Sequence, residues 1–407
     1  MGLRKFDEDD LYAALDDLAG RQERIEKALF RRYLERRGRP PRLFLYDVTT
    51  SYLEGEKNEL GEYGYNRDGK RGKLQIVIGL LADEEGEPLA VRVFEGHRSD
   101  PTTVVDQIKI LQGQFGVKEL VFVGDRGMVK SKGKEALSGA KLRYITALTD
   151  PQIRRLLSQG TLQLSLFSEQ VCEVEGGDGV RYILRKNESE AWRERRRLED
   201  KLAKLEEKIQ ARNEQVRTHP RCRPQVGQRA LATWIVKYKL TGLVEIKLEG
   251  RELKLERGEE AMQRSLDLAG CYVVTTDVPR TDLSAQQVHD SYVSLEKVER
   301  DFRTLKTGLL EVRPVWVRKE NRTRGHVFCC MLALKVSREM ERRLRAAFGT
   351  TDTRADAITL PDALLALTRL CLLHYPVDEK TTLTKLPQPD SRQQEILKAL
   401  GVSLPAM

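Results

Sequence analysis

Residues 43–95 contain three short apolar segments, LFLYDVT at 43–49, KLQIVIGLLAD at 73–83 and PLAVRVFE at 88–95. Their length and their β-branched and aromatic residues are typical of strands. The sequence EEGE at 84–87 separates the last two segments, so we expect them to pair as a hairpin. The three segments therefore predict the first strands of a sheet.

A helix and further strands follow this hairpin. Residues 101–115 repeat apolar side chains at helical spacing after the capping sequence Ser99-Asp100-Pro101. Residues 119–125 and 143–148 are apolar runs of strand length. Three strands, a helix, a strand, a short helix and a strand predict an α/β fold, in which helices flank a mixed sheet.

The rest of the chain divides by composition. Residues 8–37 predict a helix in two pieces with a break at Gly20, and residues 284–310 predict one long helix. Between 151 and 265, charged residues surround short strands and a heptad-like run at 198–209, which favours a helical hairpin or surface helix over a long coiled coil. These patterns divide the chain into an N-terminal helical segment (1–40), a first sheet-forming part (41–150), a charged segment (151–265), a second part (266–335) and a C-terminal helical region (336–407).

Composition excludes several classes of protein. With 407 residues and 40% apolar side chains, the chain can bury a large core, which excludes intrinsic disorder. Apolar runs fall far short of the roughly 20 residues of a membrane span, and no signal peptide opens the sequence, so we expect a cytoplasmic protein. Six cysteines without a C-x-x-C pair indicate free thiols rather than a zinc site. The net charge of +9 is only a weak indication of nucleic-acid binding.

Two aspartates occupy unusual positions. Asp47 and Asp125 each follow an apolar run that predicts a strand. A carboxylate at the polar end of a buried strand lies at the rim of the sheet, where a site can form. The alternative is that each aspartate only makes a turn or a cap, as aspartates in loops commonly do.

A third acid lies on the predicted helix 284–310. Tyr292, Glu299 and Lys306 are seven residues apart, which places them on one helical face, and Arg303 shares that face. A glutamate between an aromatic ring and two cations suits metal binding by the acid and phosphate binding by the cations. The alternative is a solvated face on which Glu299 and Arg303 form an ordinary ion pair one turn apart.

The spacing Tyr292-x2-Leu295-x3-Glu299-x6-Lys306 resembles the Tyr-Arg-Glu-Lys signature of insertion-sequence DDE transposases, whose catalytic domain is RNase H-like. The segments YDVTT at 46–50 and VGDRG at 123–127 resemble that family's two aspartate motifs, and GHVFCCMLAL at 325–334 resembles its post-catalytic helix. Leu295 stands where the signature has arginine, so the DNA-backbone contact that the resemblance would imply at this position is not expected here. The region before Asp47 is short for the family, so we expect a reduced or missing N-terminal DNA-binding module.

The resemblance implies a transposase that cleaves element ends and transfers the strands into target DNA. It also implies an RNase H-like catalytic domain formed by residues 41–150 and 266–335, which an insertion domain at 151–265 interrupts before the glutamate helix. Asp47, Asp125 and Glu299 would be the catalytic residues and would hold two Mg²⁺ or Mn²⁺ ions. Tyr292, Arg303 and Lys306 would contact DNA. Arg126 would either contact DNA or pair with a neighbouring acid.

The resemblance also leaves alternatives and implies partners. The partners would be double-stranded DNA, at element ends and target, and a second copy of the chain on DNA. The basic residues between 313 and 324 would lie either along the DNA or in a solvated loop. A nuclease of the same fold without strand transfer, or a catalytically silent DNA-binding remnant, is the alternative function.

Overall fold

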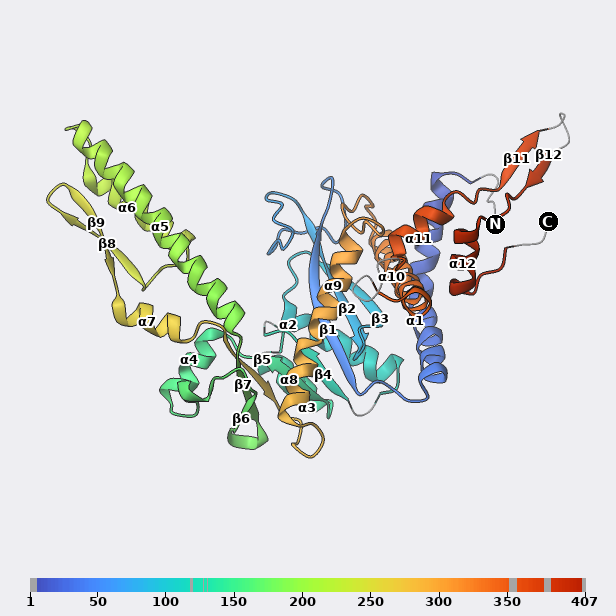
Figure 1. Cartoon of the computed structure of the whole chain (residues 1–407), viewed down its shortest axis with the longest axis horizontal. Coiled ribbons are helices and arrows are strands. Elements are labelled where there is room, and N and C mark those ends of the chain that lie inside the picture. Colours follow the sequence, from blue (N-terminus) through green and yellow to red (C-terminus); the bar gives the residue numbers. More distant parts are fainter. Residues whose placement is uncertain are drawn as a thin grey trace. The chain divides into compact units, whose positions relative to one another are not determined.

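The computed structural model describes residues 6–117, 120–126, 128–129, 131–350, 357–376 and 382–404. The chain divides into two compact units: unit 1 comprises residues 1–122 and 294–407, and unit 2 comprises residues 123–293. Figure 1 labels the helices and strands of both units. The domain boundaries drawn from the sequence, at 40, 150, 265 and 335, stay predictions.

Three antiparallel strands form the centre of unit 1. They are β1 (Leu43–Tyr52), β2 (Gln75–Asp83) and β3 (Pro88–Glu95), with β2 in the middle. Every residue of β2 is buried, as its almost continuous apolar sequence indicates. Gly79 of β2 is required where it stands, because a Cβ there would lie 2.3 Å from the hydroxyl of the fully buried Tyr46. The predicted hairpin is therefore confirmed.

Helices pack around these strands. Helix α10 (Glu320–Phe348) contacts α1 (Glu8–Arg37) and β3, and α9 (Leu295–Lys306) contacts β1. The core includes Phe44 and Tyr46 of β1 and Phe328 of α10, all fully buried. The remaining elements of unit 1 are α1 (Glu8–Arg37), α2 (Asp100–Lys109) with a π-helical turn (Ile110–Gln114), α9 (Leu295–Lys306), α10 (Glu320–Phe348), α11 (Leu360–Leu367), β11 (Leu373–Pro376), β12 (Thr382–Lys385) and α12 (Ser391–Leu400).

Helix α1 is continuous, so the predicted break at Gly20 is wrong. Asp7 and Asp10 form a capping box at its start, and Gly38 ends it in the left-handed conformation. A glycine inside a helix costs only about 1 kcal/mol relative to alanine. The packing of α1 along α10 offsets that cost.

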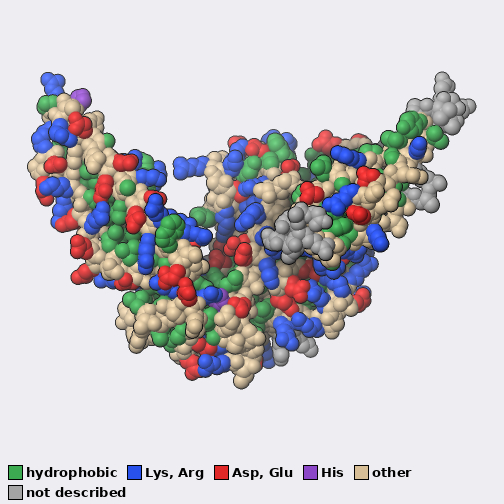
Figure 2. Space-filling view, viewed as in Figure 1, with side chains coloured by type: hydrophobic (Ala, Val, Ile, Leu, Met, Phe, Trp, Pro, Cys, Tyr) green, Lys and Arg blue, Asp and Glu red, His purple; other side chains and the backbone are tan. Residues whose placement is uncertain are grey.

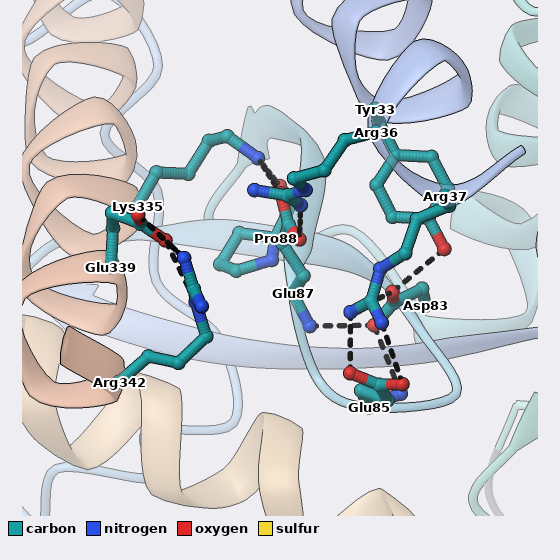
Figure 3. A network of polar contacts seen from close by, with 10 residues as sticks. All are labelled: Tyr33, Arg36, Arg37, Asp83, Glu85, Glu87, Pro88, Lys335, Glu339 and Arg342. Carbon is teal, nitrogen blue, oxygen red and sulfur yellow. Dashed lines mark hydrogen bonds and ion pairs between the residues drawn. The ribbon is translucent and has the colours of Figure 1, made fainter. Parts of the chain in front are cut away.

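The turn between β2 and β3 fastens both α1 and α10 (Figure 3). The Tyr33 hydroxyl of α1 donates a hydrogen bond of 2.9 Å to the Asp83 carboxylate, which also accepts the backbone N–H of Glu87 at 2.7 Å. From α10, Lys335 donates to the Glu87 carboxylate at 2.9 Å and to the Pro88 carbonyl at 2.7 Å. One tight turn therefore connects two helices that are distant in sequence.

Unit 2 contains an antiparallel array of four strands. Their order is β5 (Arg143–Ala147), β10 (Cys271–Thr276), β7 (Arg181–Lys186) and β6 (Cys172–Glu175). Its core includes Leu184 of β7 and Val273 of β10, which are fully buried. The division between the units falls within β4 (Val121–Gly124). The elements of this part are β5 (Arg143–Ala147), β6 (Cys172–Glu175), β7 (Arg181–Lys186), β10 (Cys271–Thr276), α3 (Ser131–Gly139), α4 (Asp150–Ser158) and α8 (Ala285–Val293).

A second hydrophobic core in unit 2 lies between β7 and β10 in the sequence. The elements are α5 (Glu188–Thr218), α6 (Pro224–Lys237), β8 (Val244–Glu249), β9 (Glu252–Arg257) and α7 (Glu259–Asp267). Leu202, Leu205 and Ile209 of α5 pack against Leu231 of α6 and Leu253 of β9. The heptad-like run therefore packs within its own segment, as expected. Basic and acidic side chains are interspersed over α5 and α6 (Figure 2).

The predicted helix 284–310 is two helices, α8 and α9, separated at Ser294. The second one ends at Lys306, after which Thr307 is extended. The predicted α/β class, in which helices flank a sheet, is confirmed. Among the helices in the described ranges, none combines the length and apolar character that crossing a bilayer requires.

Candidate functional site

Asp47 lies inside β1 rather than at its end. The strand continues to Tyr52, with Thr49, Thr50 and Ser51 buried. The Asp47 side chain is half-buried and accepts a hydrogen bond of 2.7 Å from the backbone N–H of Val48. The prediction that Asp47 ends a strand was therefore wrong, whereas Asp125 does directly follow β4.

Glu299 lies on α9, the helix that packs against β1. The buried face of α9 includes Val298 and Phe302, whereas the Glu299 side chain is exposed. Within unit 1, the helix that carries Glu299 thus contacts the strand that carries Asp47. These two predicted acids belong to directly packed elements of one unit.

Lys306 ends α9 with its amine in a buried ion pair. Its Nζ lies 2.8 Å from the Asp68 carboxylate, and the Lys306 and Asp68 side chains are 11% and 2% exposed. Burial lowers the pKa of Lys306, and the hydrogen bond that its ammonium group donates to Asp68 opposes that shift. Arg313 forms an ion pair with the same Asp68 oxygen. The signature lysine is thus held by an acid that sequence reasoning missed, because NRDG at 66–69 indicates only a turn.

The other cations of unit 1 differ in availability. The Arg303 side chain is exposed on α9. In the basic run after α9, Arg322 pairs with Asp16 at 3.1 Å and Arg324 donates to the Val93 carbonyl at 2.9 Å. Like Arg313, these two side chains fasten parts of unit 1 together. Arg318 and Lys319 are exposed.

In unit 2, Asp125 and Tyr292 come together. The Tyr292 hydroxyl on α8 donates a hydrogen bond of 3.2 Å to Asp125 Oδ1. The Asp125 backbone carbonyl accepts the Thr146 hydroxyl of β5 at 3.2 Å and the Met128 N–H at 3.0 Å. Asp125 is exposed, so its carboxylate is accessible while its backbone is fixed by β5 and the following turn.

Arg126 lies next to Asp125 and forms a surface ion pair. Its Nη1 is 3.8 Å from the Asp150 carboxylate at the start of α4, and the two side chains are 56% and 75% exposed. Exposed pairs at such distances contribute little stability, typically about 0–1 kcal/mol. The observed geometry favours the ion-pair alternative for Arg126 in the free protein.

Whether a metal ion can bind depends first on which side chains could serve as its ligands. Within the described residues of either unit, no three His, Cys, Asp or Glu side chains are grouped closely enough to hold a metal ion. The predicted ligands are all carboxylates, whose hard oxygen atoms suit Mg²⁺. In donor chemistry alone, Asp47, Asp125 and Glu299 fit a divalent ion of this type.

Sequence comparison associates most of this chain with one family. A model of the family described as "Transposase DDE domain" matches residues 38–335. The matched range contains Asp47, Asp125 and Glu299. None of the curated proteins matches the sequence.

Among solved structures, the chain is similar to the piggyBac transposase in its synaptic complex with hairpin DNA. That similarity has a TM-score of 0.40 and 10% sequence identity, over 98% of this chain and 72% of that chain. Two paired-end complexes of the Mos1 transposase, one with the left transposon end and one with Mn, give TM-scores of 0.19 at 13% identity. Each covers 35% of this chain and 45% of the Mos1 chain.

Proposed function

Because the chain belongs to the transposase DDE domain family, and is therefore an enzyme of DNA transposition, we propose that it cleaves DNA at insertion-element ends and joins those ends to target DNA. The observation that carries this proposal is the family match over residues 38–335, which includes all three signature acids. The RNase H-like fold class predicted from the sequence agrees with that membership, and DNA binding follows from it.

Enzymes of this family depend on divalent metal ions. We propose that Asp47, Asp125 and Glu299 hold two of them, Mg²⁺ or Mn²⁺, because hard carboxylate oxygens are the preferred ligands. When bound, such ions polarise the phosphoryl group and activate the attacking hydroxyl for in-line displacement. The hydrogen bond from Tyr292 supports this assignment, since it restrains the Asp125 carboxylate.

The cations have different proposed roles. Arg303, exposed on the helix of Glu299, can bind a DNA phosphate directly. The Lys306 ammonium group is paired with Asp68, so a phosphate that binds Lys306 competes with that carboxylate. We propose that Lys306 contacts DNA and that Asp68 sets the position of the Lys306 ammonium group. Tyr292 contacts DNA through its ring, while its hydroxyl restrains Asp125. Arg126 exchanges Asp150 for a phosphate, which the weak, exposed ion pair permits.

Larger-scale features are also proposals. Residues 151–265 would be an insertion domain that interrupts a catalytic domain formed by 41–150 and 266–335, with helical regions at 1–40 and 336–407. Two copies would assemble on paired element ends as a homodimer. Light scattering with and without DNA ends measures this state, and a monomer on paired ends would contradict it. A cytoplasmic location stays a prediction.

Glu299→Gln tests the proposed chemistry. The substitution keeps the shape of the side chain and removes the charge that binds a metal ion, so Mg²⁺-dependent cleavage should fall at least about a thousandfold while DNA affinity changes little. Glu296→Gln is the matched control, because Glu296 is exposed on the same helix and belongs to none of the predicted motifs. Undiminished cleavage by Glu299→Gln would refute the site assignment. Cleavage by the unmodified chain without joined products would instead indicate a nuclease.

A further inference from the structure

The connection between β1 and β2 is coloured blue in Figure 1. Two of its aromatic side chains are exposed to solvent. Tyr63 is 64% exposed and Tyr65 is 82% exposed. Three exposed cations, Arg67, Lys70 and Arg71, follow within six residues of Tyr65. Large rings are normally at least partly covered in folded proteins, so two of them close together in a basic segment indicate a binding surface.

The backbone that carries Tyr65 is fixed by hydrogen bonds. The Tyr65 carbonyl accepts the Gln75 side chain at 3.3 Å, and the Arg67 N–H donates to the Thr50 hydroxyl at 3.0 Å. The Asn66 side chain donates to the Lys70 carbonyl at 2.8 Å, which closes the turn. These hydrogen bonds therefore hold the backbone that carries the Tyr65 ring in a defined conformation.

Gly64 shows how closely this segment approaches the end of β3. A Cβ at position 64 would lie 2.2 Å from the Gly96 carbonyl oxygen, so the glycine is required for the approach. The Gly96 carbonyl itself accepts the Gln75 side chain at 2.8 Å. The exposed tyrosines on either side of Gly64 are thus held against the edge of the sheet, with their rings directed outward.

Asp68 connects the same turn to the end of α9. Its buried carboxylate accepts the Tyr52 backbone N–H at 3.2 Å and pairs with Lys306 and Arg313. Because Lys306 ends the helix of Glu299, Asp68 joins the segment that carries the two exposed rings to a residue of the catalytic signature. This connection lies entirely within unit 1.

The chemistry around Tyr65 selects a flat, anionic ligand. The Arg67 guanidinium lies 5.8 Å from the Tyr65 ring centre and is held there by an ion pair of 2.7 Å with Asp100. A planar base can stack on the ring while its phosphates meet Lys70 and Arg71. An acidic peptide would satisfy the cations, but it would leave both rings in water.

We propose that Tyr65, supported by Arg67, is a stacking platform for an unpaired nucleobase of the DNA end, with Lys70 and Arg71 binding the flanking phosphates. The proposal rests on the proposed function, because it takes DNA as the ligand. In an intact duplex the base faces are covered by their neighbours, so the platform acts on a frayed or single-stranded end. It adds a contact to the DNA that lies outside the three signature motifs.

Binding to two probes tests the platform. One probe is a short duplex with an unpaired thymidine tail, and the other is the same duplex with an abasic tail. Tyr65→Ala should weaken binding to the thymidine tail by about tenfold, whereas Tyr65→Phe should retain it, because stacking uses the ring and not the hydroxyl. Tyr65→Ala should not change binding to the abasic tail. Tyr375→Ala, which removes another exposed ring, is the matched control.

Salt dependence separates stacking from phosphate binding. Arg71→Gln should weaken binding to both probes equally. Because the phosphates beside the unpaired base are single-stranded, the loss of one charge should reduce the log–log salt slope by about 0.7. Equal weakening of both probes by Tyr65→Ala would overturn the platform. Coupling here means that Tyr65→Ala weakens binding to the thymidine tail more than binding to the abasic tail. If the chain cuts and joins DNA but this coupling is absent, the platform alone is refuted. If coupling is present but no cleavage occurs, the proposed function fails and the platform stands.

Discussion

Tyr33→Phe tests whether a buried hydrogen bond fastens α1 to the β2–β3 turn. The change removes the hydroxyl that donates to Asp83 at 2.9 Å and keeps the ring that packs beside Phe30. The Asp83 carboxylate is fully buried and retains the backbone N–H groups of Glu85 and Glu87. Loss of one hydrogen bond to a buried charged group costs about 1.5–3 kcal/mol. The protection of α1 amides against hydrogen exchange should therefore fall roughly 10- to 150-fold at neutral pH.

The effect should depend on pH in a definite direction. Burial raises the pKa of Asp83, and the hydrogen bonds from the Glu87 backbone and the Tyr33 hydroxyl oppose that shift. Without the hydroxyl, the folded-state pKa of Asp83 rises further above the unfolded value. A raised carboxyl pKa gives stability at low pH that is lost as pH rises through the folded pKa. The deficit of Tyr33→Phe should thus grow from acidic to neutral pH.

Hydrogen exchange of the variant and the unmodified chain at the same pH provides the comparison, since intrinsic exchange rates then cancel. Tyr12→Phe is the matched control, because Tyr12 is on the same helix and its hydroxyl bonds the exposed Glu8 at 2.8 Å. That control should change protection only slightly. Unchanged α1 protection in Tyr33→Phe, or a deficit that shrinks as pH rises, would refute the reasoning.

Three further predictions concern stability. Asp68→Asn leaves the buried Lys306 ammonium group without its counter-charge and should lower the free energy of unfolding by about 3–5 kcal/mol. Urea unfolding, followed by a signal from unit 1, measures this loss. A loss below about 1 kcal/mol would contradict the buried ion pair. Gly325→Ala places a Cβ 2.1 Å from the Leu15 carbonyl and should cost about 1–3 kcal/mol by separating α1 from α10, seen as a lower melting temperature. Leu205→Ala should cost about 2–5 kcal/mol by leaving a cavity in the second core of unit 2, with faster proteolysis there than in β7 as the readout.

The sequence predicts the strands well because buried strands consist mainly of apolar residues. The segments at 73–83 and 88–95 are almost entirely apolar, and the structure buries nearly all of both strands. Gly20 misled the prediction of α1 because the cost of one glycine is small compared with long-range packing on α10. The apolar spacing from 284 to 310 continues through Ser294, so periodicity alone cannot reveal that two helices meet there.

The candidate site is less accessible to sequence reasoning. Asp47 was expected at a strand end, but three buried polar residues extend β1 beyond it, and such residues do not look like strand interior in one sequence. Asp68 could not be found, because its role depends on Lys306 and Arg313, more than two hundred residues away. The bond between Asp125 and Tyr292 likewise depends on tertiary structure. Motif spacing identified the residues, and only the fold supplies their partners.

The segment that forms the second core of unit 2 begins directly after β7 and ends directly before β10, and this arrangement has an evolutionary consequence. The Asn187 N–H donates to the Gly270 carbonyl at 2.9 Å, and the adjoining residues Lys186 and Cys271 are paired across β7 and β10. Because β7 and β10 pair antiparallel, the residues between them form the connection of a long β-hairpin. Lengthening a closed loop costs only about 0.6 kcal/mol per doubling. Such a connection can be gained, exchanged or lost between lineages without shifting the register of the strands that carry it.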